Sequence, residues 1–199
     1  LETALKSRKP WSQVKNKERL RTSAEFGVLG LNTNFRVLLA NAGVFSDAQT
    51  AYYHKSLGGY HAAKLKRYQE MIDFYISPEI NAIGKALQTG SVPVVDSTLR
   101  ESKILNMLNT RYVKYSPNAA PIDNSKNALG NAWFVSEIQN VTTADEEMLA
   151  LKNFYPETTA IVDDEFLSIV KSPLSVDTMA SIAMTNYATK KFTYHSESS

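Results

Sequence analysis

Apolar and charged residues recur with the period of an α-helix between residues 60 and 76. The apolar positions fall three and four residues apart, at Leu65, Tyr68, Met71, Ile72 and Tyr75. Such a stripe is typical of a helix that packs one face on a core. The pattern predicts a helix that begins at Tyr60 and ends at Ser77-Pro78, because proline disfavours helical geometry in the residue before it.

Gly58 and Gly59 precede this helix. Glycine tolerates positive φ angles and lets another backbone or a ligand come close, so we expect one of these roles here.

Short β-branched and aromatic runs predict four strands, at residues 35–39, 111–115, 132–138 and 159–162. Alternation from residue 182 to residue 194 predicts a terminal β-hairpin that turns near Ala188-Thr189. The loop at 116–131 is long for a compact domain, and loops of that length are usually functional or mobile.

Three further helices are expected between these strands. The first begins at Ser77-Pro78 and ends at Gly90, and the second begins at Asp96 or Ser97. The third begins at Thr143 and is stopped by Pro156. Capping boxes are predicted at Thr98 with Glu101 and at Thr143 with Glu146.

This order of elements indicates an α+β fold. Strand, helices, strand, strand, helix, strand is the split βαβ arrangement of ferredoxin-like folds, here with extra helices in the first crossover and a mainly antiparallel sheet. We expect a basic, partly helical arm at 1–33, a core domain at 34–170 and a C-terminal β-hairpin at 171–199. The hairpin would be the start of a truncated second sheet.

Composition narrows the class of protein. The 199 residues are 43% hydrophobic, which is ample for a core, and the chain has no cysteine. No apolar run approaches the roughly 20 residues of a membrane span, and no signal peptide is visible. The net charge is +2, but residues 1–78 carry 12 basic and 6 acidic side chains. A basic block near the N-terminus is either a solvated arm or a surface for anionic lipid, and no nucleic-acid motif accompanies it.

A polar and aromatic cluster before and after the glycine pair is the candidate binding site. Its members are Tyr52, Tyr53, His54, Lys55, Tyr60 and His61, and Trp133 is added from a later strand. Flat rings with hydrogen-bonding tips suit sugars, but the same tyrosines would equally suit the edge of a core with their hydroxyls satisfied. No metal is expected, because His54 and His61 are seven residues apart and no cysteine completes a site.

Catalytic motifs are missing from the sequence. No nucleophile elbow, P-loop or dinucleotide fingerprint occurs, so we expect no cofactor and no catalytic residue. Asp163, Asp164 and Glu165 are adjacent, but neighbours on an extended strand point to opposite faces and would not converge on a cation.

Two segments carry a family resemblance. FSDAQTAYYHKSLGGYHAAKLKRYQ at 45–69 and NALGNAWFVSEI at 127–138 are similar, in order and spacing, to segments of bacterial YfhO-type polytopic membrane proteins. FRVLLA resembles the strand before the first segment. The chain departs from the pattern at Ser46, where asparagine is usual, and at Leu57, where isoleucine is.

YfhO-type proteins resemble the GT-C class of glycosyltransferases, which use lipid-linked sugars. The resemblance implies that this chain belongs to an extracytoplasmic (periplasmic) soluble region of an integral membrane protein whose reactive acids lie elsewhere. It implies a non-catalytic accessory domain that contacts glycan or lipid-linked sugar, with the remainder of the parent protein as its partner. The alternative is a structural or assembly module with no ligand of its own.

Overall fold

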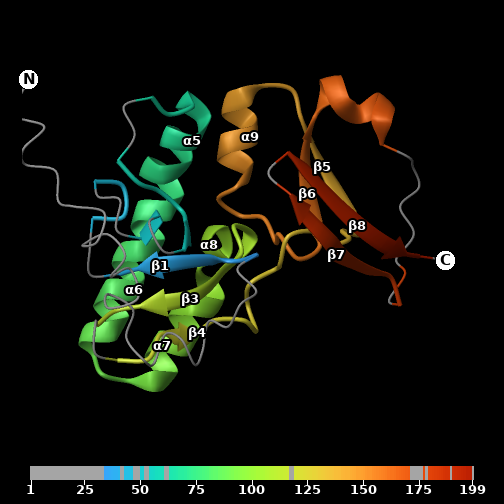
Figure 1. Ribbon diagram of the computed structural model, residues 1–199. Coiled ribbons are helices and arrows are strands. Elements are labelled where there is room, and N and C mark those ends of the chain that lie inside the picture. The colour runs from blue at the N-terminus through green and yellow to red at the C-terminus, as the bar shows by residue number, and fades with distance from the viewer. Residues whose placement is uncertain are drawn as a thin grey trace, which may run out of the picture.

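The structure is a computed structural model that describes residues 34–40, 43–46, 50–51, 54–60, 63–116, 119–170, 177, 179–188 and 190–198. It is an α+β protein, as the sequence predicts (Figure 1). The basic arm expected at 1–33 lies outside the described residues.

The first sheet has four strands in the order β2-β1-β3-β4. They are β1 (Arg36–Leu39), β2 (Lys55–Ser56), β3 (Thr110–Lys114) and β4 (Ile122–Asp123). β1 pairs in parallel with both β2 and β3, and β4 runs antiparallel to β3. The sheet is therefore mixed.

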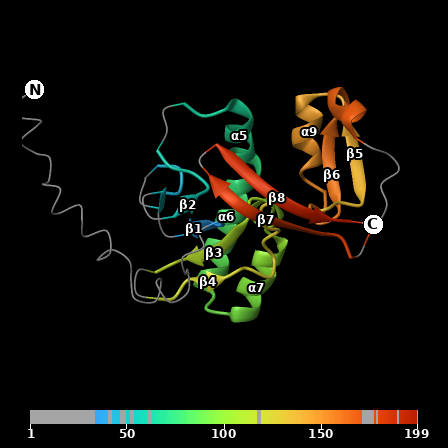
Figure 2. The ribbon, with the colours of Figure 1, turned by 45° about the vertical axis from the view of Figure 1, so that its right-hand side comes forward.

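A second, two-stranded sheet consists of β5 (Glu137–Val141) and β6 (Thr159–Asp163), which pair in parallel over five residues. The helix α9 (Ala144–Ala150) lies between them in sequence. The strands β7 (Ser181–Ala188) and β8 (Lys191–Glu197) form the predicted C-terminal antiparallel hairpin. In Figure 2 this hairpin extends from the second sheet towards β1 and β2.

The ferredoxin-like arrangement with a mainly antiparallel sheet is wrong. The strand predicted at 132–138 forms only at its end, where β5 begins at Glu137. The strands divide between two sheets, and β1 lies directly beside β3 with no strand between them. The reason lies in the connections. A run of helices joins β1 to β3, and α9 joins β5 to β6. Because helical crossovers of this kind link parallel neighbours, each pair of strands is parallel.

The expected first helix begins late and does not stop at the proline. α5 spans Lys66–Met71, a π-helical turn follows at Ile72–Ile76 (η2), and α6 continues from Ser77 to Gln88. The wider turn, in which the amide of Ser77 bonds the carbonyl of Ile72, precedes Pro78 in the first turn of α6. π-bulges of this kind accommodate an irregularity within a continuous helix. Leu65, predicted to be in the apolar stripe, is 80% exposed just before α5.

The next predicted helix, in contrast, begins earlier than expected, and a short helix that was not predicted follows it. α7 spans Val92–Glu101 with proline in its first turn, and α8 spans Lys103–Met107. The predicted box at Thr98 is absent, since the Thr98 hydroxyl lies inside α7 and donates to the Val94 carbonyl at 2.8 Å. The second box is half formed. The Thr143 hydroxyl accepts from the amide of Glu146 at 3.2 Å, but the Glu146 carboxylate accepts from the amide of Thr142, one residue before the cap, at 2.8 Å. A 3₁₀ turn, η3, follows β6 at Asp164–Ile169.

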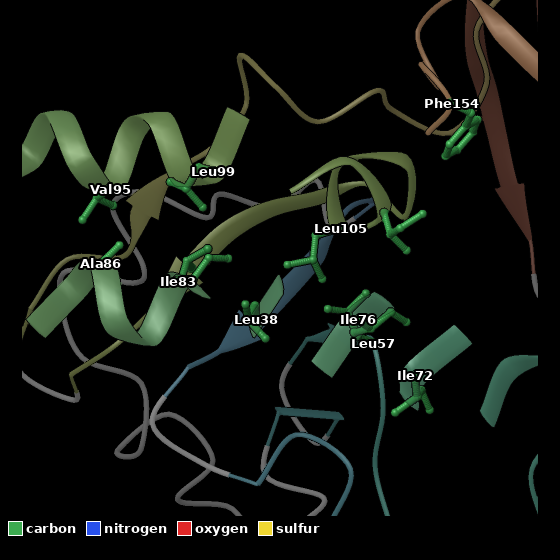
Figure 3. Packing of buried hydrophobic residues seen from close by; sticks show 12 residues of the cluster. Leu38, Leu57, Ile72, Ile76, Ile83, Ala86, Val95, Leu99, Leu105 and Phe154 are labelled. Carbon is green, nitrogen blue, oxygen red and sulfur yellow. The ribbon is translucent and has the colours of Figure 1, made fainter. Parts of the chain in front are cut away.

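The core lies between the first sheet and the helices. Leu38 and Val113 from the sheet are fully buried against Ile76, Ile83 and Leu105 (Figure 3). Phe154, which follows α9, is also buried in this cluster, so the second sheet unit is anchored to the first. Each such side chain contributes about 1.5–3 kcal/mol through its burial. No helix among the described residues is long and apolar enough to span a membrane.

Candidate functional site

A cavity of about 210 Å³ lies where the C-terminal hairpin meets the edge of the first sheet; we name it the hairpin cavity. Two strands, two loops and the hairpin supply its walls. Its lining residues are Asn34, Phe35, Arg36, Lys55, Asn109, Asn131, Met184, Tyr187, Phe192 and Tyr194. Rings, amides and cations therefore share one small space.

Lys55 joins the sheet edge to the hairpin. Its Nζ atom lies 3.5 Å from the centre of the Tyr187 ring and donates to the Asn34 side-chain oxygen at 3.0 Å. An ammonium group this close to a ring face is attracted by the ring quadrupole. The Tyr187 ring in turn packs against Phe192, with centroids 5.0 Å apart. The hairpin thus presents aromatic faces to a cation on β2.

The guanidinium group of Arg36, the second cation of the hairpin cavity, is held by a backbone carbonyl. Its Nη1 atom donates to the Leu108 carbonyl at 2.7 Å. Phe35 beside it is buried and held edge-on by Tyr112, with ring centroids 5.1 Å apart. The side chains on this wall are therefore pre-positioned by contacts with β3 and with the end of α8.

The amides come from a left-handed turn and from the long loop. Asn109 has a φ of 58°, a conformation that asparagine tolerates better than most residues. Its side-chain amide donates to the Asn34 carbonyl at 3.0 Å and to the Asn131 side-chain oxygen at 3.3 Å. These bonds hold the end of the loop against the start of β1.

Buried asparagines fix the rest of this loop. The Asn124 amide donates to the Asn106 side-chain oxygen at 2.9 Å and to the Thr110 carbonyl at 2.8 Å. Asn106 in turn donates to the Leu99 carbonyl at 2.9 Å. Buried amides are costly unless bonded, and these are bonded. This network was not predicted, although the density of asparagines between residues 106 and 131 is a sequence signal for it.

A larger cavity of about 610 Å³, which we name the apolar groove, lies between α5 on one side and α9 and β6 on the other. Mostly apolar side chains line it, including Met71, Met148 and Trp133. At its rim Arg67 pairs with Glu147 at 2.8 Å. The Trp133 ring nitrogen donates to the Pro156 carbonyl at 2.6 Å, so its polar atom is already satisfied.

The described members of the predicted site lie in different places. Lys55 lines the hairpin cavity and Trp133 lines the apolar groove. Tyr60 is 77% exposed and lines neither of these cavities, and His54 is half-buried before β2. The remaining predicted residues, Tyr52, Tyr53 and His61, lie outside the described residues.

The glycine pair has both of the expected properties. A Cβ atom on Gly58 would lie 2.6 Å from the Val44 carbonyl oxygen and 2.4 Å from the Phe45 ring, so only glycine fits this close approach. Gly59 has a φ of 147°, in a region that L side chains rarely adopt. The segment therefore turns sharply between β2 and α5.

The carboxyl group of Glu79 has a strongly raised pKa. Burial raises the pKa of its carboxyl from 4.5 to about 7, opposed by hydrogen bonds from the amides of Ile104 and Leu105. Its two oxygens accept these amides at 3.0 and 2.9 Å. The carboxyl thus caps the start of α8 from α6 and lies among structural elements, away from both cavities.

Other acidic and histidine side chains in the described ranges make local contacts. Asp163 accepts the amide of Glu165 at 3.0 Å, which caps η3. His195 pairs with Glu197 at 3.1 Å on an exposed strand. Within the described ranges, no group of three or more histidine, cysteine or acidic side chains is placed to hold a metal ion.

Similarity to known proteins was tested at three levels. Comparison of the chain with protein-family models, with curated proteins and with solved structures finds no match.

Proposed function

We propose that this chain is a non-catalytic accessory domain that contacts glycan at the hairpin cavity. The observation that carries the proposal is the chemistry of the lining. The rings of Tyr187, Phe192 and Tyr194 share one space with three asparagine amides and two cations. Aromatic faces suit the apolar faces of sugar rings, while amides both donate to and accept from hydroxyl groups.

The size of the hairpin cavity supports a small ligand. Its volume of about 210 Å³ lies below the roughly 300–1,000 Å³ that is usual for sites of drug-sized ligands. A single sugar unit is therefore a better occupant than an extended chain, whose remaining units would lie outside in solvent.

The resemblance of residues 45–69 and 127–138 to YfhO-type proteins supplies the setting of the proposal. Lys55 belongs to the first of these segments and Asn131 to the second, and both line the hairpin cavity. We place the domain on the extracytoplasmic, periplasmic side of a bacterial membrane glycosyltransferase-like protein. In that setting the remainder of the parent protein is its partner, and a glycan or lipid-linked sugar is its ligand.

A structural or assembly module is the second candidate, and specific contacts favour it. Lys55 already bonds Asn34, and the Trp133 nitrogen already bonds a carbonyl. Leu65, which lines the apolar groove, and Leu149, which lies on α9, are both strongly exposed. In this alternative the aromatic residues pack against a partner and bind no sugar.

Calorimetric or NMR titration of the purified chain with neutral and acidic mono- and disaccharides tests the proposal. We expect binding that weakens about tenfold in Tyr187→Leu and is unchanged in Tyr115→Leu, an exposed tyrosine that lines neither cavity. Absence of binding to every saccharide would favour the structural module. Turnover of activated sugars by the purified chain would reject a non-catalytic role.

A further inference from the structure

We infer that the hairpin cavity selects an acidic sugar, one whose ring carries a carboxylate or a phosphate group. This inference rests on the proposed glycan contact and adds the class of ligand. Among the described residues, the lining includes two cations, Arg36 and Lys55, and no aspartate or glutamate. A neutral sugar would need neither charge.

Within the part of the chain that the structure describes, each cation has N–H donors beyond those already bonded, and these could donate to an anion. Arg36 has five N–H donors, of which Nη1 bonds the Leu108 carbonyl. Lys55 has three donors, of which one bonds Asn34 while the ammonium group lies over the Tyr187 ring. A guanidinium and an ammonium at one small cavity are a suitable pair for a carboxylate or phosphate oxygen.

The surroundings of the two cations differ from those of two basic residues on α5. Lys66 pairs with Glu70 at 3.5 Å and Arg67 with Glu147 at 2.8 Å. Among the residues that the structure describes, no ion pair with a carboxylate is found for Arg36 or Lys55, and both are half-buried. Water screens a half-buried charge less than an exposed one, so an anion bound there interacts more strongly.

The rings make the ligand a sugar and not a bare anion. Tyr187 and Phe192 are about half exposed and form one aromatic wall, and the Lys55 ammonium group lies against the Tyr187 ring. Apolar ring faces would be poor neighbours for a free phosphate ion, but they gain from covering a sugar ring. A nucleotide also has a ring and a phosphate, but the cavity is too small for base, ribose and phosphate together.

Matched ligand pairs test the inference on the purified full chain. The pairs are glucuronic acid against glucose, glucose 1-phosphate against glucose, and adenosine monophosphate and inorganic phosphate as comparisons. We expect at least one acidic sugar to bind about tenfold more tightly than glucose at low salt, equivalent to about 1.4 kcal/mol. Which of the two acidic sugars binds more tightly distinguishes a carboxylate ligand from a phosphate ligand. The preference should diminish at high salt.

Variants assign the preference to its residues. Lys55→Met should reduce the acidic-over-neutral ratio several-fold, whereas Tyr187→Leu should weaken both sugars together. Lys85→Met, which removes an exposed charge from α6, is the control and should change neither. Circular dichroism spectra and unfolding midpoints of all variants exclude global misfolding as the cause, and amide hydrogen exchange in β7 and β8 reports whether the hairpin has detached.

The outcomes separate the two proposals. Equal binding of glucose and the acidic sugars would overturn this inference and leave the glycan contact standing. Tighter binding of adenosine monophosphate, or of inorganic phosphate alone, would overturn the assignment to sugars. No binding of any saccharide would remove the glycan contact, and the inference with it.

Discussion

The ammonium group of Lys55 lies 3.5 Å from the centre of the Tyr187 ring and so connects two strands that are 132 positions apart in the chain. Lys55 lies on β2 at the edge of the first sheet, and Tyr187 lies on β7 of the C-terminal hairpin. Most hairpin residues are exposed, so this contact and the rings around it define where the hairpin meets the sheet (Figure 2).

Tyr187→Leu should therefore detach the hairpin locally. We expect faster amide hydrogen exchange in β7 and β8, with a loss of about 0.5–2 kcal/mol in the local opening free energy, as is typical of a cation–π contact. The global unfolding midpoint should change little, because the core cluster contains no hairpin residue. Tyr115→Leu serves as the matched control. Unchanged exchange in Tyr187→Leu would show that the contact does not hold the hairpin.

Gly58→Ala should destabilise the protein by about 1–3 kcal/mol. The added methyl group would meet the Val44 carbonyl oxygen at 2.6 Å, and backbone atoms yield less readily than a flexible side chain. Chemical denaturation measures the change in the free energy of unfolding.

Gly84→Ala is the matched control for this prediction. Gly84 lies within α6, and its added Cβ would meet nothing within 4 Å. Alanine favours a helix interior over glycine by about 0.5–1 kcal/mol, so this variant should be more stable than the parent. Equal effects of the two substitutions would contradict the packing at Gly58.

Local signals predicted much of this architecture. The strands at β1, β3 and β6, the hydroxyl cap of Thr143 and the hairpin depend on residues near one another in sequence, where propensity and alternation are informative. The glycine pair was predictable for the same reason. Strand pairing was not, since which strands lie side by side depends on packing between distant segments.

The candidate site was predicted only in part. Lys55 was identified from the polar and aromatic cluster, but its neighbours Tyr187, Asn109 and Arg36 come from remote parts of the chain. No spacing rule relates them. Trp133 was expected in the same patch, and the folding of the long loop places it in the apolar groove instead.

Asn124→Ala should loosen the long loop. Asn124 donates to the Asn106 side chain and to the Thr110 carbonyl in the protein interior, and it accepts from Asn127 at 2.8 Å. Each buried group left without a partner costs about 1–3 kcal/mol, so the loss of stability should be at least of that size. Proteolysis within residues 116–131 should also become faster. Asn81→Ala, at an exposed position of α6, should have no such effect, and equal behaviour of the two variants would count against the network.

Glu79 makes stability depend on pH in an unusual direction for a carboxylate. Its pKa is raised to about 7 in the folded protein and is close to 4.5 when exposed. Between these values the folded state binds more protons than the unfolded state, so stability falls as pH rises. The contribution is fully present below about pH 4.5 and is lost as pH rises through about 7. From the full shift its upper limit is about 3 kcal/mol.

Urea unfolding of the parent chain and of Glu79→Gln at several pH values between 5 and 8 measures this contribution. Glutamine does not titrate, and its single oxygen keeps one of the two amide bonds to α8, so the variant should lack this part of the decline with pH. The difference in unfolding free energy between the two proteins should therefore change by about 1–2 kcal/mol over that range. Glu101→Gln, at an exposed position of α7, controls for removal of a negative charge and should follow the parent. A constant difference between parent and Glu79→Gln would show that the folded carboxyl ionises as it does in water, and that its burial between α6 and α8 costs the charged form nothing.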